Sequence, residues 1–153
     1  MSLLFITLYH KFTIKSMKQI VKNRKANFEY TILDTYTAGI ILNGEDVKFI
    51  RNGKINISDS FCYISNGEIF LQNVIIDATN TSKKLLLNKK EIRTLKTNVE
   101  QKGLTIVPLE IFDNNGLLKT KIALAKGKTL YDKKRTIKEK DIDRETWRLT
   151  KNY

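Results

Sequence analysis

The stretch FCYISNGEIFLQNVII, residues 61–76, decides the fold class of this chain. Two apolar runs flank Asn66-Gly67, and both turn residues tolerate the positive φ angles that a two-residue hairpin turn needs. The stretch NNG at 114–116 repeats the signal between residues 104–112 and 117–124. The sequence therefore predicts two antiparallel hairpins. Pro108 predicts an edge strand or a bulge within 104–112, because proline lacks the N–H that a strand interior needs.

Outward from these hairpins, the strand pattern continues. Apolar and polar residues alternate over 28–32. Two short apolar runs, 38–42 and 47–50, are each followed closely by a glycine, and we interpret them as further strands.

One helix is predicted to interrupt the strands. Asn88 and Glu91 have the spacing of a capping box. The apolar residues that follow fall on one helical face: Ile92, Leu95 and Val99. Gly103 supplies the stop. A weaker short helix is expected near 53–56 or around Ser58, where the strand pattern breaks.

Several short strands, two hairpins and an inserted helix favour a mainly β fold. The expected architecture is a small closed antiparallel β-barrel of the oligonucleotide-binding type, with inserted helices and a basic C-terminal tail. A two-sheet sandwich is the alternative. The short chain, 153 residues, and its inserted helix favour the barrel.

The composition points to a polyanionic partner. Lys and Arg number 28 against 16 Asp and Glu, a formal charge of +12. One cysteine, Cys62, and one histidine, His10, exclude a disulfide framework, a cysteine metal site and a histidine triad. The sequence has no phosphate-binding glycine motif and no apolar run of membrane-spanning length. We expect no catalytic residue, metal or cofactor.

A metal-dependent nuclease is disfavoured by strand geometry. Its candidate ligands would be Glu45, Asp46 and Asp59. Glu45 and Asp46 are adjacent, and neighbouring residues of a strand point to opposite faces.

Residues 1–16 differ from the rest of the chain. Leu3 to Tyr9 is apolar, but positive charge follows this run instead of preceding it, which does not fit a secretory signal. Met17 opens a segment that resembles an ordinary start. We expect residues 1–16 to be a dispensable extension or a start-site artefact, with an amphipathic membrane anchor as the alternative.

Basic residues gather in three segments. Residues 126–153 and 83–102 each carry a net charge of +5, and four more bases lie within 18–25. Together the clusters suit a phosphate-binding surface around a barrel. The strand aromatics lie in the apolar phase, which favours reading of RNA shape and backbone over base stacking.

The tail has too few apolar residues for a buried stripe: Leu130, Ile137, Ile142, Trp147 and Leu149. We expect it to be disordered in isolation and to become helical on a polyanion. A solvated helix packed on the barrel is the alternative. The predicted organisation is an extension at 1–16, an RNA-binding barrel at 17–128 and a basic tail at 129–153.

Five motifs, in chain order, carry a family resemblance. They are Asn23-Arg24-Lys25-Ala26 with Tyr30-Thr31-Ile32, AGIILNGEDVKFIR at 38–51, Lys84-Leu85-Leu86-Leu87 with Lys89-Lys90-Glu91-Ile92, GLTIVPL at 103–109, and IALAKGK at 122–128 followed by Tyr131-Asp132-Lys133-Lys134. The tail spacing Lys138-x-Lys140-Asp141-x-x-Arg144 also fits. On these motifs, which cover Met17 to Lys151, the chain resembles the SsrA-binding protein (SmpB) family, the partner of transfer-messenger RNA (tmRNA).

The resemblance implies an oligonucleotide-binding-type barrel that binds the tRNA-like part of tmRNA. It implies a tail that is disordered when free and becomes helical in the empty messenger channel of a stalled ribosome, beside small-subunit RNA at the decoding centre. It also implies a cytoplasmic, non-enzymatic and membrane-free role in trans-translation, the rescue of ribosomes with peptide tagging. Alanyl-tRNA synthetase and elongation factor Tu would be indirect partners.

The resemblance also assigns roles by position. The residues expected to face the RNA are Asn23, Arg24, Lys25, Asp46, Lys48, Arg51, Asn88, Lys89, Lys126 and Lys128. Those expected at the decoding centre and along the tail are Asp132, Lys133, Lys134, Lys138, Lys140 and Arg144. Asp46 would accept from RNA or orient Lys48 or Arg51. A strand-end salt bridge is its alternative role.

The chain departs from the family at a few positions. Glu is usual where Asp46 stands, His where Asn88 stands, and Arg where Lys126 and Lys134 stand. A longer segment before Lys83 is reduced here to residues 77–82. A ribosomal or other structural RNA-binding protein with an oligonucleotide-binding barrel is the alternative function.

Overall fold

The computed structural model of the protein describes residues 17–151, and the predicted extension at 1–16 lies outside the described residues. The strands are β1 (Met17–Lys22), β2 (Tyr30–Ile40), β3 (Ile55–Asn56), β4 (Phe61–Ser65), β5 (Glu68–Ile76), β6 (Thr79–Leu86), β7 (Thr105–Asn114) and β8 (Leu117–Gly127). The helices are α2 (Arg24–Glu29), α3 (Gly44–Arg51), α4 (Lys89–Lys102) and α5 (Leu130–Lys151).

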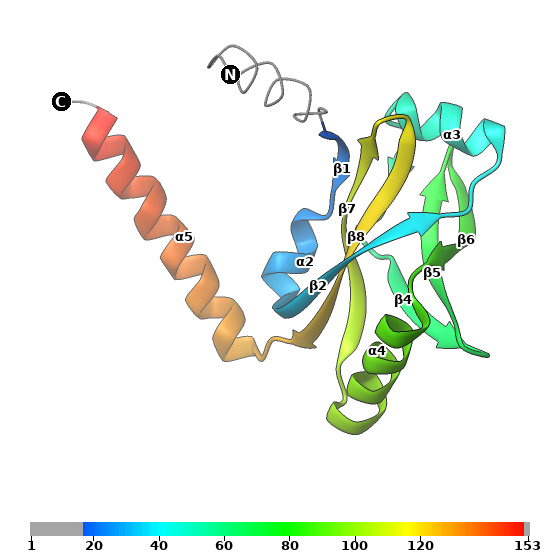
Figure 1. Ribbon diagram of the computed structural model, residues 1–153. Coiled ribbons are helices and arrows are strands. Elements are labelled where there is room, and N and C mark those ends of the chain that lie inside the picture. The colour runs from blue at the N-terminus through cyan, green and yellow to red at the C-terminus, as the bar shows by residue number, and fades with distance from the viewer. Residues whose placement is uncertain (1–16, 152–153) are drawn as a thin grey trace, which may run out of the picture.

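The strands form one antiparallel sheet that returns on itself. The hydrogen-bonded order is β7-β4-β5-β6-β2-β8, and pairing between β7 and β8 completes the ring. Strand β1 adds to β7, and β3 adds to β5. The shortest ladder of the ring joins β4 and β7, which pair only at Cys62 and Ile106 among the described residues. The mainly β prediction is confirmed as an antiparallel ring of strands with helices (Figure 1).

The core lies inside this ring. Ile69, Leu71 and Leu85 point inward from β5 and β6 and are almost fully buried. Helix α4 adds Ile92 and Leu95 to the same cluster. Burial of these side chains is the main stabilising contribution to the domain.

Both predicted hairpins are present. Asn66 and Gly67 have φ angles of 50° and 75°, and Asn115 and Gly116 have 57° and 85°. These left-handed pairs join β4 to β5 and β7 to β8. The bulge predicted at Pro108 is confirmed by a register shift between Pro108 and Glu110. Strand β7 as a whole is not an edge strand, since it has partners along both edges. At Pro108 itself, β7 pairs only with β8 in the described sheet, because the β4 pairing lies at Ile106 and the β1 pairing ends at Glu110.

Helix α4 confirms the helix predicted from Asn88 to Gly103. The Asn88 N–H donates to the Glu91 carboxylate at 3.0 Å, which stabilises the first turn. Gly103 ends the helix with a φ of 62°.

The strand interpretation of residues 47–50 is wrong, since they belong to helix α3. The Asn43 side chain accepts from the Asp46 N–H at 2.7 Å, and the Asp46 carboxylate accepts from the Asn43 N–H at 3.3 Å. This capping box starts a helix. Val47 and Phe49 alternate as in a strand, but Val47 and Ile50 lie three residues apart, which places them on one face of a helix.

Two further local predictions are wrong. Residues 24–29 form helix α2, so Phe28 is helical and the strand begins only at Tyr30. Asn23 caps this helix by accepting from the Ala26 N–H at 3.1 Å. The short helix expected near 53–56 or Ser58 is absent from the described chain. Ile55 and Asn56 pair with β5 instead, after a turn at Gly53 with φ of 76°.

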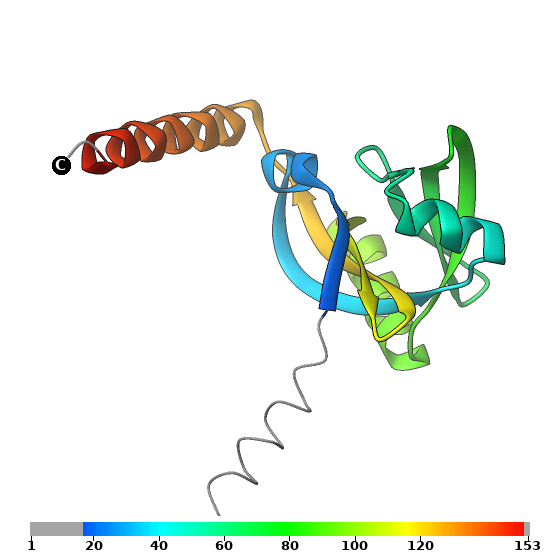
Figure 2. The same ribbon diagram turned by 90° about the horizontal axis from the view of Figure 1, so that it is seen from above.

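The tail from Leu130 to Lys151 is a single helix, α5, and none of its described side chains is buried. It extends away from the ring, as the two views in Figures 1 and 2 show. The lack of burial agrees with the sparse apolar pattern. Disorder of the tail in the free protein stays a prediction.

Candidate nucleic-acid interface

Asn23 holds helix α2 against the ring. The residue is only 3% exposed. The amide nitrogen donates to the carbonyls of Pro108 at 2.9 Å and Ile57 at 3.3 Å, while the backbone N–H donates to the Leu109 carbonyl at 2.7 Å. These bonds also satisfy backbone groups beside the β7 bulge. Both amide hydrogens of Asn23 are used within the protein, so this side chain supports the surface and does not extend from it.

Arg24 and Lys25, the next two residues, are exposed on α2. The Lys25 ammonium lies 2.7 Å from the Asp59 carboxylate and 3.8 Å from Glu29. The hydrogen bond to Asp59 raises the pKa of Lys25 above its usual range. Both bases are available to a polyanion, Lys25 by exchanging a protein carboxylate for a phosphate.

Asp46 and Lys83 form an ion pair that ties α3 to β6. The Asp46 carboxylate accepts from the Lys83 ammonium at 2.6 Å and also from the Asn43 N–H. The expected salt bridge of Asp46 is therefore present, at a helix N-terminus and not at a strand end. Its partner is Lys83, which was predicted only as one base of the segment 83–102.

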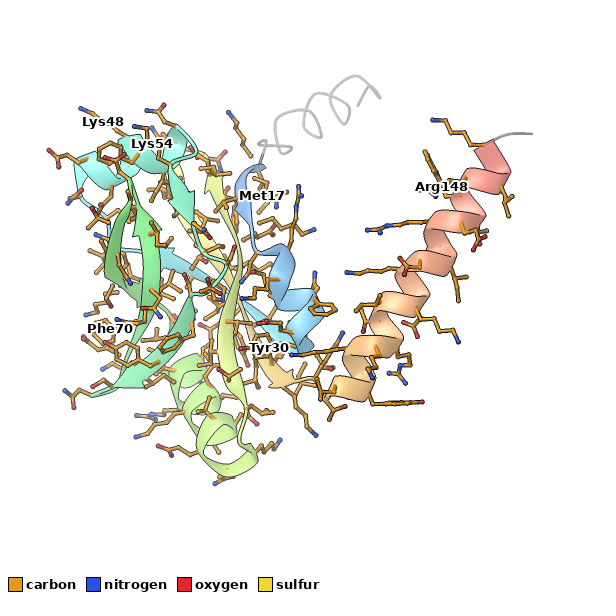
Figure 3. The ribbon with its side chains drawn as sticks, turned by 180° about the vertical axis from the view of Figure 1, so that it is seen from behind. Met17, Tyr30, Lys48, Lys54, Phe70 and Arg148 are labelled. Atoms are coloured by element: carbon orange, nitrogen blue, oxygen red, sulfur yellow. The ribbon has the colours of Figure 1, made fainter. Side chains whose placement is uncertain are left out.

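Lys48 and Arg51 leave the exposed side of α3 in different ways. Lys48 points away from the strands at the outer end of the molecule in Figure 3. Arg51 is directed to the β7–β8 turn, where its guanidinium donates to the Gly116 carbonyl at 3.1 Å and lies 3.5 Å from Asp113. A groove of about 380 Å³ lies between Arg51 and Lys18 of β1.

Asn88 and Lys89 are exposed at the start of α4. Figure 1 shows α3 and α4 at opposite ends of the ring. The predicted RNA-facing residues therefore occupy separate regions of the molecule, and no single compact patch contains all of them.

Besides the regions at α3 and at the start of α4, a third group of predicted residues lies where α2, β8 and α5 meet. Lys126 is exposed and pairs across the sheet with Thr31. Lys128 is half-buried, and its ammonium donates to the Asn27 carbonyl at 3.0 Å and to the Thr136 hydroxyl at 3.1 Å. Lys128 is thus directed to protein atoms, unlike Lys126.

Thr129 and Asp132 together cap the start of the tail helix. The Asp132 carboxylate accepts from the Thr129 hydroxyl at 2.8 Å, while the Asp132 N–H donates to that hydroxyl at 3.3 Å. The hydrogen bond from Thr129 lowers the pKa of Asp132 below its ordinary range. The capping role of Thr129 was not among the predictions, although Thr129-x-x-Asp132 has the spacing of a capping box.

The remaining predicted tail residues lie on α5. Lys133 is half-buried, and the others are exposed: Lys134, Lys138, Lys140 and Arg144. Arg144 lies 3.6 Å from Asp141 on the same helix. The helix therefore presents several bases on a surface that contacts little of the ring.

Two absences apply to the described part of the chain. Residues 17–151 bring no three His, Cys, Asp or Glu side chains together in a metal-binding arrangement. Over the same residues, no helix combines the length and apolar character needed to cross a membrane.

The comparisons with known proteins point to one family. The family model described as SmpB protein matches residues 20–152. The SsrA-binding protein of Flavobacterium johnsoniae is 46% identical over 87% of this chain and 95% of its own length. That of Wolbachia from Brugia malayi is 48% identical over 89% and 99%.

A solved structure gives the same result. It is described as "tmRNA-SmpB: a journey to the center of the bacterial ribosome" and is 40% identical to this chain with a TM-score of 0.59. The match covers 73% of this chain and 86% of the other. The chain belongs to the SmpB family of SsrA-binding proteins.

Proposed function

We propose that this protein binds the tRNA-like part of tmRNA and brings it to stalled ribosomes for trans-translation. Helix α5 is the observation that carries the proposal. It is basic, buries no side chain and extends from a ring of strands that also presents bases. Family membership supports the same role, since the relatives are SsrA-binding proteins and the solved structure concerns tmRNA-SmpB and the ribosome. The role requires binding and delivery but no chemical step.

The ring of strands supplies the RNA-binding body, and we take it to be a barrel of the oligonucleotide-binding type. Phosphate contacts come from the exposed bases Arg24, Lys25, Lys48, Lys89 and Lys126. Arg51 binds both the Gly116 carbonyl of the β7–β8 turn and the RNA, and the exposed Asn88 offers a polar side chain to the RNA. Asn23 and Asp46 act indirectly, because their polar groups are engaged within the protein.

The tail serves the ribosome. Helix α5 enters the empty messenger channel, with Asp132, Lys133 and Lys134 at its root near the decoding centre and later bases along small-subunit RNA. A helix without buried side chains can leave the ring without exposing any core. Alanyl-tRNA synthetase and elongation factor Tu are indirect partners through the RNA, and the protein acts in the cytoplasm.

The test is to capture the tagged protein from its own cells and to sequence the bound RNA. We expect one dominant RNA with a tRNA-like end. A variant truncated after Lys128 should retain this RNA but lose ribosomes. A broad mixture of ribosomal RNA, unchanged when tmRNA is deleted, would overturn the proposal in favour of a structural ribosomal protein.

A further inference from the structure

Lys128 lies at the junction of three elements. Its backbone N–H donates to the Glu29 carbonyl at 2.8 Å, and its ammonium donates to the Asn27 carbonyl at 3.0 Å. Asn27 and Glu29 are in the last turn of α2, where helix carbonyls have no partner within the helix. Lys128 therefore satisfies two carbonyls of α2, and its positive charge suits a helix C-terminus.

The same ammonium reaches α5. It donates to the Thr136 hydroxyl at 3.1 Å, and that hydroxyl donates to the Asp132 carbonyl at 2.9 Å. A hydroxyl has one hydrogen to donate and two lone pairs to accept, so both bonds form together. Lys128 is thus a bridge between the end of α2 and the second turn of α5.

No other direct polar link of this kind holds α5 in the described chain. Over residues 17–151, the hydrogen bonds and ion pairs of residues 137–151 stay within α5. A groove of about 430 Å³ separates the first turns of α5 from Tyr30, Thr31 and Ile32. The direction of α5 therefore depends on its root, where Lys128 acts.

We propose that Lys128 is a positioning residue that sets the direction in which the tail helix leaves the ring. Its ammonium is engaged by Asn27 and Thr136 and does not neutralise an RNA phosphate. The root of α5, residues 129–136, is then held in the free protein, and the remainder is held only by helix continuity. The consequence for delivery rests on the proposed function: a tail with a set direction meets the messenger channel in one orientation.

The test measures the distance between spin labels at Thr97 and Lys138, both exposed and both changed to Cys, in the free full-length protein. The native Cys62 is buried, and burial raises the pKa of its thiol, so it stays protonated and unlabelled. Thr136→Val removes the hydroxyl and keeps the shape and charge, while Thr136→Ser restores the hydroxyl. Lys128→Met is matched by Lys126→Met, which removes the same charge two residues away.

We expect Thr136→Val and Lys128→Met to broaden the distance distribution. The population in which the root of α5 is held by the Lys128 bridge should fall about tenfold relative to the population in which it is released. Thr136→Ser and Lys126→Met should keep the original distribution. In RNA binding, Lys126→Met should reduce the slope of log K against log salt by about one, and Lys128→Met should leave it unchanged. Peptide tagging should fall in Thr136→Val at unchanged RNA affinity.

An unaltered distance distribution in Lys128→Met would overturn the proposal. So would a salt slope that Lys128→Met reduces as much as Lys126→Met does, since Lys128 would then contact phosphate. The distance measurement needs no RNA. Failure of the wild-type protein to bind tmRNA would therefore count against the proposed function and leave the test of Lys128 intact.

Discussion

Asp46 and Lys83 face each other across α3 and β6, with 2.6 Å between Oδ2 and Nζ and side chains only 12% and 17% exposed. The resemblance to the family assigned Asp46 to the RNA, but in the structure its carboxylate holds α3 in place. The pair fixes the start of the helix that carries Lys48 and Arg51. Asp46 thus influences the basic surface through its position.

Loss of Lys83 should destabilise the protein. Lys83→Met leaves the largely buried Asp46 carboxylate without its cation, so we expect the free energy of unfolding to fall by about 2–3 kcal/mol. Lys84→Met is the matched control, since it breaks the more exposed pair with Glu68 on the same strand and should cost at most about 0.5 kcal/mol. Urea unfolding measures both. Equal losses of unfolding free energy in the two variants would show that the Asp46–Lys83 pair stabilises the protein no more than the exposed Lys84–Glu68 pair.

Glycine in the β5–β6 turn should stabilise the protein. Asp77 and Ala78 adopt φ angles of 47° and 65°, and alanine is strained in this left-handed region. Ala78→Gly should raise the free energy of unfolding by about 0.5–1 kcal/mol, because glycine relieves the strain. Ala78→Val should lower it, since a β-branched side chain tolerates positive φ still less. Thermal unfolding measures both variants. An unchanged stability of Ala78→Val would contradict this account.

Acid should weaken the root of the tail helix. The Thr129 hydroxyl lowers the pKa of Asp132, so the ionised carboxylate is favoured in the folded helix. This contribution is complete above the ordinary aspartate range and is lost as the pH falls through that range toward the lowered pKa. The protection of the Lys133 amide against exchange, relative to its intrinsic rate at each pH, should fall over that interval, because its N–H donates to the Thr129 carbonyl. Thr129→Val should remove most of this pH dependence, and a persisting one would assign it to another carboxyl.

Removal of the tail should separate stability from rescue. Truncation after Lys128 deletes α5, which buries no side chain, and keeps the Lys128 contacts with α2. We expect a melting temperature near that of the full chain, retained binding to the tRNA-like RNA, and loss of peptide tagging. Filter binding and an in-vitro tagging assay measure the last two. Continued tagging by the truncated protein would show that α5 is not the element that enters the channel.

A second change tests the tail without deleting it. Asp132, Lys133 and Lys134 changed together to Ala should reproduce much of the tagging defect, because the cap of α5 and two of its first bases are lost together. RNA affinity should change little. The protein truncated after Lys128 lacks these three residues and serves as the reference for RNA affinity. A loss of RNA affinity in the full-length triple variant would instead show that these residues contact tmRNA.

Local rules determined much of this protein from its sequence. The Asn66-Gly67 and Asn115-Gly116 turns, the helix from Lys89 to Lys102 and the Pro108 bulge follow from backbone preferences of neighbouring residues. The unburied tail follows from its sparse apolar residues. Helix α3 was misread because its apolar spacing suits a strand or a helix, and the Asn43–Asp46 cap settles between them.

Only the tertiary structure decided which polar groups meet across the chain. Asp46 and Lys83 are 37 residues apart, and Lys128 is 101 residues from Asn27. A lysine in the sequence looks the same whether its ammonium faces water or donates to a backbone carbonyl. The choice depends on which backbone groups the fold leaves unsatisfied beside it. For this reason the sequence located the basic segments, and the fold separated the exposed bases from Lys83 and Lys128, which hold the molecule together.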